Sequence, residues 1–210
     1  MNRIFNRARS ALSVRGTVLV ELALVIPLAF SMIFGCLELS KMFRSQEILS
    51  AVTREGANAG FRECGQENNP EATCLPTVHD RIVTYSNSVL PGVETVISVY
   101  KYVPAGPNPL VDPESAQLVG IIGVNRETGK TAGGYSSHYV PGPLDPDAPD
   151  PETDMYRKVP LAAFPLNSLH DKNERIVISE VFYRYQPPVN SPALPFFRFL
   201  SKQLYEVTIF

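Results

Sequence analysis

The chain has 210 residues, a formal net charge of −2 and a pI of about 5.9. This near-neutral balance gives no electrostatic reason to bind nucleic acid, whose binding proteins carry a marked excess of positive charge. The sequence holds 19 prolines, most of them after residue 70, which favours short strands and surface loops over an all-helical domain.

The first predicted element is an apolar helix from Thr17 to Leu37. Its roughly 21 residues, at about 1.5 Å each, span about 30 Å, which is the hydrocarbon thickness of a bilayer. The sixteen residues before it contain no acid, and this predicts a cytoplasmic N-terminus and an external remainder. A cleaved secretory signal is the alternative, although the run is long for one and no small-x-small site follows it.

Two residues inside this run are unusual. Glu21 is its one charged residue, and a carboxylate in hydrocarbon is costly enough to suggest a function. The alternative is a protonated glutamate, or one whose side chain reaches the membrane edge. Pro27 removes a backbone hydrogen bond and predicts a local kink, unless it is simply tolerated in a membrane helix.

Four short motifs in this region resemble a known family. The string RGTVLVELALVIPLAFSMIFGCLELSKMF is similar to the N-terminal segment of TadE-like proteins, minor pilins or pseudopilins of the tight-adherence (Tad/Flp) pilus system. Leu22 stands where the family usually has an aromatic residue. The matching motifs are Arg15-Gly16, Val20-Glu21-Leu22-Ala23-Leu24, Pro27 and Gly35-Cys36-Leu37-Glu38.

The resemblance implies a processing and assembly route. A prepilin peptidase would cut after Gly16, removing a basic leader of residues 1–16 and freeing the amino group of Thr17. Glu21 could then pair with that amine on a neighbouring subunit, which avoids an unpaired charge in lipid. Glu21, Pro27 and Glu38 are the expected assembly or register residues.

The implied partners are the inner membrane, the prepilin peptidase, other pilins or pseudopilins and Tad assembly proteins. The implied role is pilus biogenesis and surface adherence by a single-pass protein with a periplasmic C-terminal domain. The alternative is an uncleaved single-pass anchor that displays a periplasmic binding domain.

The helix is expected to continue beyond the membrane, through residues 38–62. Apolar or small residues recur at spacings near three and four, which predicts an amphipathic helix with one face on the globular domain. Gly56, Ala57, Ala59 and Gly60 would permit close approach of another element; fraying near the helix end is the alternative. The stripe consists of Leu39, Met42, Leu49, Val52, Gly56 and Ala59.

Residues 63–210 are long enough for one domain with a modest core. Strands are predicted at 93–103, 175–185 and 204–210, which are rich in β-branched and aromatic residues. A short helix is predicted at 80–89, and residues 104–113 and 140–160 are predicted as proline-rich loops. The expected fold is α+β: a long helix packed on a small antiparallel sheet, as in pilins.

Two cysteines are consistent with export of residues 63–210 to an oxidising compartment. Cys64 and Cys74 flank a short polar loop, and in an oxidising periplasm they could form a disulfide worth roughly 2–3 kcal/mol. Two reduced thiols are the alternative. Cys36 lies in the membrane run and is expected to act as a small apolar residue.

No motif predicts an enzyme, a cofactor or a metal site. Gly129-Lys130-Thr131 is similar to the end of a phosphate-binding loop, but Val124 occupies the position of its first glycine. The acidic run 145–154 lacks the spacing and turn glycine of an EF-hand and is expected to be a solvated loop. The histidines are scattered, at His79, His138 and His170.

Overall fold

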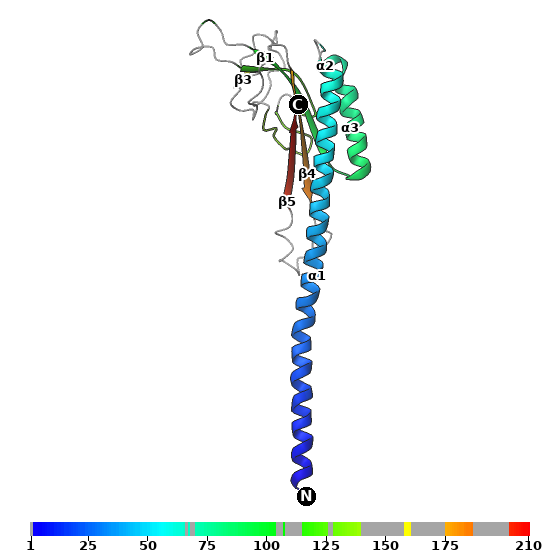
Figure 1. Cartoon of the computed structure of the whole chain (residues 1–210), viewed down its shortest axis with the longest axis vertical. Coiled ribbons are helices and arrows are strands. Elements are labelled where there is room, and N and C mark those ends of the chain that lie inside the picture. The colour runs from blue at the N-terminus through cyan, green and yellow to red at the C-terminus, as the bar shows by residue number, and fades with distance from the viewer. Residues whose placement is uncertain are drawn as a thin grey trace. The chain divides into compact units, whose positions relative to one another are not determined.

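The computed structural model describes residues 2–65, 67, 70–103, 107, 115–125, 128–139, 158–160, 175–186 and 202–210. The chain contains two compact units, Met1–Arg44 and Ser45–Phe210. The expected α+β class is confirmed, because a long N-terminal helix is followed by an antiparallel sheet with a second helix (Figure 1).

Helix α1 runs from Asn2 to Cys64 without interruption, with Pro27 inside it. It therefore begins well before the predicted residue 17 and ends two residues after the predicted residue 62. The first unit consists of α1 as far as Arg44, and the remainder of the helix belongs to the second unit.

The second unit is built on a five-stranded sheet in the order β3-β2-β1-β4-β5. All four neighbouring pairs of strands are antiparallel. The central strand β1 pairs with β2 through a register shift between Val99 and Tyr100. The strands are β1 (Glu94–Val103), β2 (Ser115–Ile122), β3 (Lys158–Pro160), β4 (Arg175–Tyr185) and β5 (Lys202–Ile209).

One face of the sheet carries the C-terminal part of α1 and helix α3 (Leu75–Val89). Gly56 and Gly60 let α1 lie close to β4: an added Cβ would stand 2.6 Å from the Ser179 Oγ and 2.7 Å from the Val177 Cγ1. Real Cβ contacts are not that short, so the helix and strand pack closely because both positions are glycine. This confirms that the small residues admit another element.

Within the second unit, the members of the expected apolar stripe of α1 lie on its buried side. Leu49, Val52, Gly56 and Ala59 are buried, while Arg54, Glu55 and Asn58 between them are exposed. Thr53 is buried as well, and its hydroxyl donates to the Leu49 carbonyl at 3.0 Å, so the polar group is satisfied within the helix.

The opposite face of the sheet holds the main hydrophobic core. Val124, Tyr135 and Tyr139, from the chain after β2, lie over this face and pack on its buried side chains. Gly123, with φ +93°, makes the turn out of β2; an added Cβ there would stand 2.0 Å from the Thr95 carbonyl oxygen. The core cluster consists of Val96, Tyr100, Ala116, Leu118, Ile121, Ile176, Ile178 and Phe182.

Several element boundaries differ from the predictions. Helix α3 begins at Leu75 rather than residue 80, because Pro76 occupies the first turn, where a missing N–H costs nothing. Strand β5 begins at Lys202 rather than residue 204. Strand β2 and the short helix α2 (Pro70–Thr73) were not predicted. Strand β3 corrects the predicted loop at 140–160, because its three residues pair with Ser115–Gln117.

Candidate functional site: an apolar helix and its folded domain

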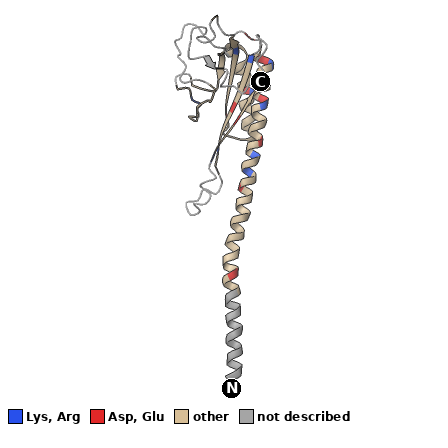
Figure 2. Ribbon diagram, turned by 60° about the vertical axis from the view of Figure 1, so that its left-hand side comes forward, with Lys and Arg blue, Asp and Glu red and all other residues tan. Residues whose placement is uncertain are grey.

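The first unit exposes a long apolar surface. From Val18 to Leu37 every large apolar side chain is exposed, with exposed fractions from 44% at Ile26 to 71% at Leu24. Exposure of this much apolar surface to water is unfavourable, so the segment requires lipid or protein around it. Among the described residues, α1 is the one helix long and apolar enough to cross a membrane. The tan stretch of α1 in Figure 2 marks this region.

Glu21 is the one charged residue between Val18 and Leu37. Its side chain is exposed on the surface of α1, among exposed valines and leucines. A carboxylate on an apolar helix can be stabilised by a cation of a neighbouring chain, or neutralised by protonation.

Pro27 lies inside α1, which continues past it without a break. The hydroxyl of Ser31 donates to the Pro27 carbonyl oxygen at 2.8 Å. This is the usual serine bond to a carbonyl one turn earlier, and it does not replace the bond lost at Pro27, whose missing N–H would have paired with the Ala23 carbonyl.

The predicted processing residues, Gly16 and Thr17, lie within α1, with helical backbone on both sides. Thr17 has its backbone described but not its side chain. Further along the same unit, Glu38 forms an ion pair with Lys41, with the Lys41 Nζ 3.2 Å from the Glu38 Oε1. Oppositely charged side chains three residues apart stabilise a helix modestly.

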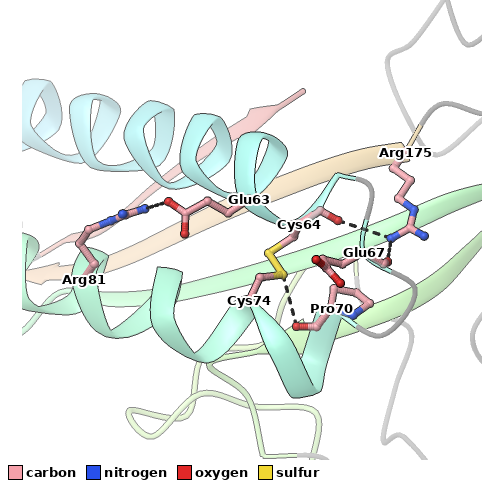
Figure 3. Close-up of a disulfide and its surroundings, with 7 residues drawn as sticks. All are labelled: Glu63, Cys64, Glu67, Pro70, Cys74, Arg81 and Arg175. Atoms are coloured by element: carbon pink, nitrogen blue, oxygen red, sulfur yellow. Dashed lines mark hydrogen bonds and ion pairs between the residues drawn. A yellow bond between two sulfur atoms is a disulfide. The ribbon is translucent and has the colours of Figure 1, made fainter.

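The second unit holds the two cysteines together. Cys64 and Cys74 form a disulfide with a Cα–Cα distance of 5.6 Å, joining the last residue of α1 to the residue before α3 (Figure 3). The Arg175 guanidinium donates to the Cys64 carbonyl at 3.4 Å and also to the Glu67 carbonyl. It thus satisfies acceptors at the C-terminus of α1, where helix carbonyls lack partners within the helix.

An ion pair also links α1 to α3 near the disulfide. The Arg81 guanidinium on α3 donates to the Glu63 carboxylate on α1 at 2.5 Å (Figure 3). Both side chains are substantially exposed, so solvent screens this ion pair and the disulfide is the stronger of the two connections. Cys36 is a free, exposed cysteine.

Sequence reasoning missed a buried acid on β4, the strand between the central β1 and the edge strand β5. Glu180 on β4 is fully buried, and its carboxylate accepts hydrogen bonds from three groups. The donors are the Ser137 hydroxyl, the His138 backbone N–H at 2.8 Å and the Tyr205 hydroxyl at 3.0 Å. The sequence signal that could have found it is an acidic residue within the mostly apolar strand RIVISEVFYRY.

Aromatic rings surround this carboxylate. Tyr135 stacks on Phe182 at 5.4 Å between ring centroids, and His138 lies 4.3 Å from the Tyr205 ring. Burial, with the negative charge of Glu180 as a second cause, raises the pKa of Tyr100 and of Tyr205 well above 10. Both phenols therefore remain neutral donors, and Glu180 holds residues 137–139 against the sheet.

The other polar motifs form no catalytic arrangement within the described residues. Lys130 pairs in isolated bridges with Asn125 and Ser136, and no helix follows Thr131 as a phosphate-binding loop requires. No group of three or more potential metal ligands occurs among the described residues. The acidic run 145–154 and His170 lie outside the described residues.

The fold and these features define a class of protein. It is an α+β protein whose N-terminal apolar helix is a candidate single membrane span and continues into a disulfide-linked domain.

Comparison with known families agrees with the sequence motifs. Residues 16–58 match the family described as "TadE-like protein", so this segment of α1 is TadE-like. The match begins at Gly16 and includes Gly56, the first of the two glycines that pack on β4. No curated protein and no solved structure matches the chain. The matched segment contains the apolar part of α1, which is long and apolar enough to cross a membrane.

Proposed function

We propose that this chain is a minor pilin or pseudopilin of a Tad/Flp-type pilus. It is inserted in the inner membrane, cleaved after Gly16 and assembled through α1, with its C-terminal domain in the periplasm. The observation that carries the proposal is the TadE-like segment 16–58, in which the large apolar side chains of residues 18–37 are exposed and Glu21 is the one carboxylate among them. Its function is then to support pilus biogenesis and surface adherence.

Cleavage is tested by the N-terminus of the mature chain. In cells with an active prepilin peptidase, N-terminal sequencing should begin at Thr17, and in cells lacking the peptidase at Met1. Gly16→Val should block the cut, because a branched side chain obstructs the extended backbone that enters a protease cleft. The matched control is Gly35→Val on the same helix, where an added Cβ meets no atom within 4 Å. A chain that begins at Met1 in both strains contradicts the proposal.

Assembly is tested at Glu21. Once Thr17 carries a free amine, Glu21 of one subunit can pair with that amine on the next, and the pair sets the register between helices. Glu21→Ala should leave membrane insertion intact and abolish or strongly reduce piliation seen by electron microscopy. Glu47→Ala, an exposed acid of α1 in the second unit, is the control. Normal piliation with Glu21→Ala would exclude the pairing role.

One observation favours the second candidate, an uncleaved anchor that displays a periplasmic binding domain. Helix α1 is continuous across residues 16 and 17, and a helical peptide bond must unwind before a protease can cut it. The same N-terminal sequencing separates the two, since an anchor keeps its first sixteen residues.

A further inference from the structure

A pocket of about 490 Å³ lies between α1 and α3 on the surface of the second unit. Arg81 already donates to the Glu63 carboxylate at 2.5 Å (Figure 3), whereas Glu55 forms no ion pair with another described residue. The pocket therefore joins an unpaired carboxylate to apolar walls and an aromatic ring, which suits a cation on a long apolar stem. Its lining residues are Ala51, Glu55, Arg81, Ile82 and Tyr85.

The residue before Glu55 carries the complementary charge on another side of α1. Arg54 and Glu55 are both exposed, differ by about 1.5 Å in height and project about 100° apart around the helix. Phe61 follows Arg54 by seven residues, on nearly the same side, and its ring lies 6.4 Å from that of Phe210 at the end of β5. Helix α1 thus presents Arg54 on the flank next to β5 and Glu55 on the flank next to α3.

Two copies that stand side by side, with these parts of α1 parallel and level, can bring unlike flanks together. The β5 flank of one copy then meets the α3 flank of the next, and Arg54 faces the pocket at the height of Glu55. The same relation recurs seven residues later, where Phe61, which is 48% exposed, meets Arg62 of the neighbour in a favourable cation–aromatic contact. One arrangement therefore covers both an unpaired acid and an exposed ring.

Contact between two like flanks is less favourable. Arg62 follows Glu55 by seven residues and so lies on the same flank of α1. Parallel, level copies that met through their α3 flanks would place Glu55 opposite Glu55 and Arg62 opposite Arg62, and like charges in contact are repulsive. Antiparallel copies would avoid this repulsion, but copies of one chain enter a membrane in the same sense.

We propose that the pocket between α1 and α3 receives Arg54 of a second copy of this chain, in a head-to-tail contact that repeats from copy to copy. The Arg54 guanidinium pairs with Glu55 beside the Tyr85 ring. Such a heterologous contact can continue through many subunits, which a two-fold contact cannot. It joins the second units rather than the apolar helices and does not require removal of the leader, so it goes beyond the proposed function.

The first test is zero-length crosslinking of Arg54→Lys in bacterial inner membranes, where all copies of the full chain have one orientation. The substitution keeps the charge and supplies an amine that a carbodiimide can join to a carboxylate. After digestion and mass spectrometry, an amide-linked product that contains Glu55 twice must join two chains. A link from position 54 of one chain to Glu55 of another is the expected product. Arg62→Lys, at an exposed arginine on the other flank, is the matched control and should give no such product.

The second test reverses the charges. Arg54→Glu and Glu55→Arg should each weaken association of the full chain in detergent micelles about tenfold in sedimentation experiments, because an attractive pair becomes a repulsive one. The double variant Arg54→Glu/Glu55→Arg should restore association, since the pair is then attractive again with its signs exchanged. Arg184→Glu is the control and should have no effect, because Arg184 is an exposed charge of β4.

Three results would overturn the proposal. One is a set of crosslinks between chains in which position 54 of Arg54→Lys is joined to a different carboxylate or to none. Another is association that neither single reversal weakens, or that the double exchange does not restore. The third is a link from position 54 to a different protein in place of a second copy. None of these results depends on whether the mature chain begins at Thr17, so the proposed function keeps its separate test.

Discussion

Glu180 combines full burial with a complete set of donors, which makes it the most tightly constrained acid among the described residues of the sheet. Removing the acceptor of three buried donors lowers stability by more than the net contribution of the three hydrogen bonds, because each donor is then buried without a partner and keeps its full desolvation penalty. The carboxylate thus holds residues 137–139 in place over the core, and its loss should lower the free energy of unfolding.

Glu180→Ala should therefore lower the free energy of unfolding by about 3 kcal/mol, as three donors are left without an acceptor. Tyr205→Phe removes only one donor and should cost about 1–2 kcal/mol. Guanidinium denaturation of the full chain in detergent micelles measures both. Glu47→Ala, at an exposed site on α1, should change the value by less than about 0.5 kcal/mol. Equal stability of Glu180→Ala and wild type would show that the three hydrogen bonds to Glu180 do not stabilise the domain.

The tyrosines near this acid predict a loss of stability in alkali. Burial raises the pKa of Tyr100 above its ordinary value of about 10, and Glu180 adds to the shift. An unfolded Tyr100 loses its proton near pH 10 while the folded one keeps it. Stability is therefore fully present below about pH 10 and falls as pH rises beyond it, by up to about 1.4 kcal/mol per pH unit for each such tyrosine.

This slope can be measured as the free energy of unfolding between about pH 9 and 11.5. Tyr100→Phe should reduce it by the share of one tyrosine, although the variant also loses the 2.5 Å hydrogen bond from Tyr100 to the Tyr139 carbonyl at every pH. Tyr85→Phe, on the exposed side of α3, should leave the slope unchanged. A slope that persists in Tyr100→Phe would assign the alkaline transition to other groups.

At the scale of elements, the contact between α1 and β4 depends on two glycines. Gly60→Ala would put a methyl group 2.7 Å from the Val177 Cγ1 and should destabilise the second unit by about 1–3 kcal/mol through overpacking. Val177→Ala removes the opposing methyls, so the double variant should recover part of the loss in thermal unfolding. Gly35→Ala has open space and should cost nothing. Additive losses in the double variant would show that the two residues do not press on each other.

The disulfide connects two helices at their ends, and its effect should also be measurable. Replacing Cys64 and Cys74 by serine together should lower the free energy of unfolding by about 2–3 kcal/mol, by freeing the short loop between them in the unfolded chain. A reductant should lower the melting temperature of the wild type and leave the double variant unchanged. Cys36→Ser should behave as wild type, because Cys36 is free. An identical response of all three proteins would mean that the bond is absent.

Strands made of one unbroken run of β-branched and aromatic residues were predictable from sequence, while strands of mixed composition and contacts between distant residues were not. Strands β1 and β4 are unbroken runs of β-branched and aromatic residues, and both were predicted to within one residue. Strand β2 (SAQLVGII) mixes small and polar residues, and becomes a strand because β1 pairs along it. Contacts such as Glu180 with Ser137, 43 residues apart, leave no local pattern.

At the scale of the whole molecule, the chain divides between an apolar helix and a self-contained second unit, Ser45–Phe210. This unit keeps the buried stripe of α1 from Leu49, both helices on the sheet, the core and the disulfide. It excludes the exposed apolar run that needs lipid or protein around it. Its stability should therefore be independent of the first 44 residues.

A fragment of residues 45–210, exported to an oxidising compartment, should then be soluble without detergent and melt within a few degrees of the full chain. A fragment starting at residue 57 loses Leu49, Val52 and Thr53, all fully buried, and should fail to fold because the sheet face they cover is left open. Circular dichroism melting compares the three proteins. If residues 45–210 unfold or aggregate while the full chain in detergent is stable, the first unit supplies packing that the second cannot replace, and the division at Arg44 is not an energetic one.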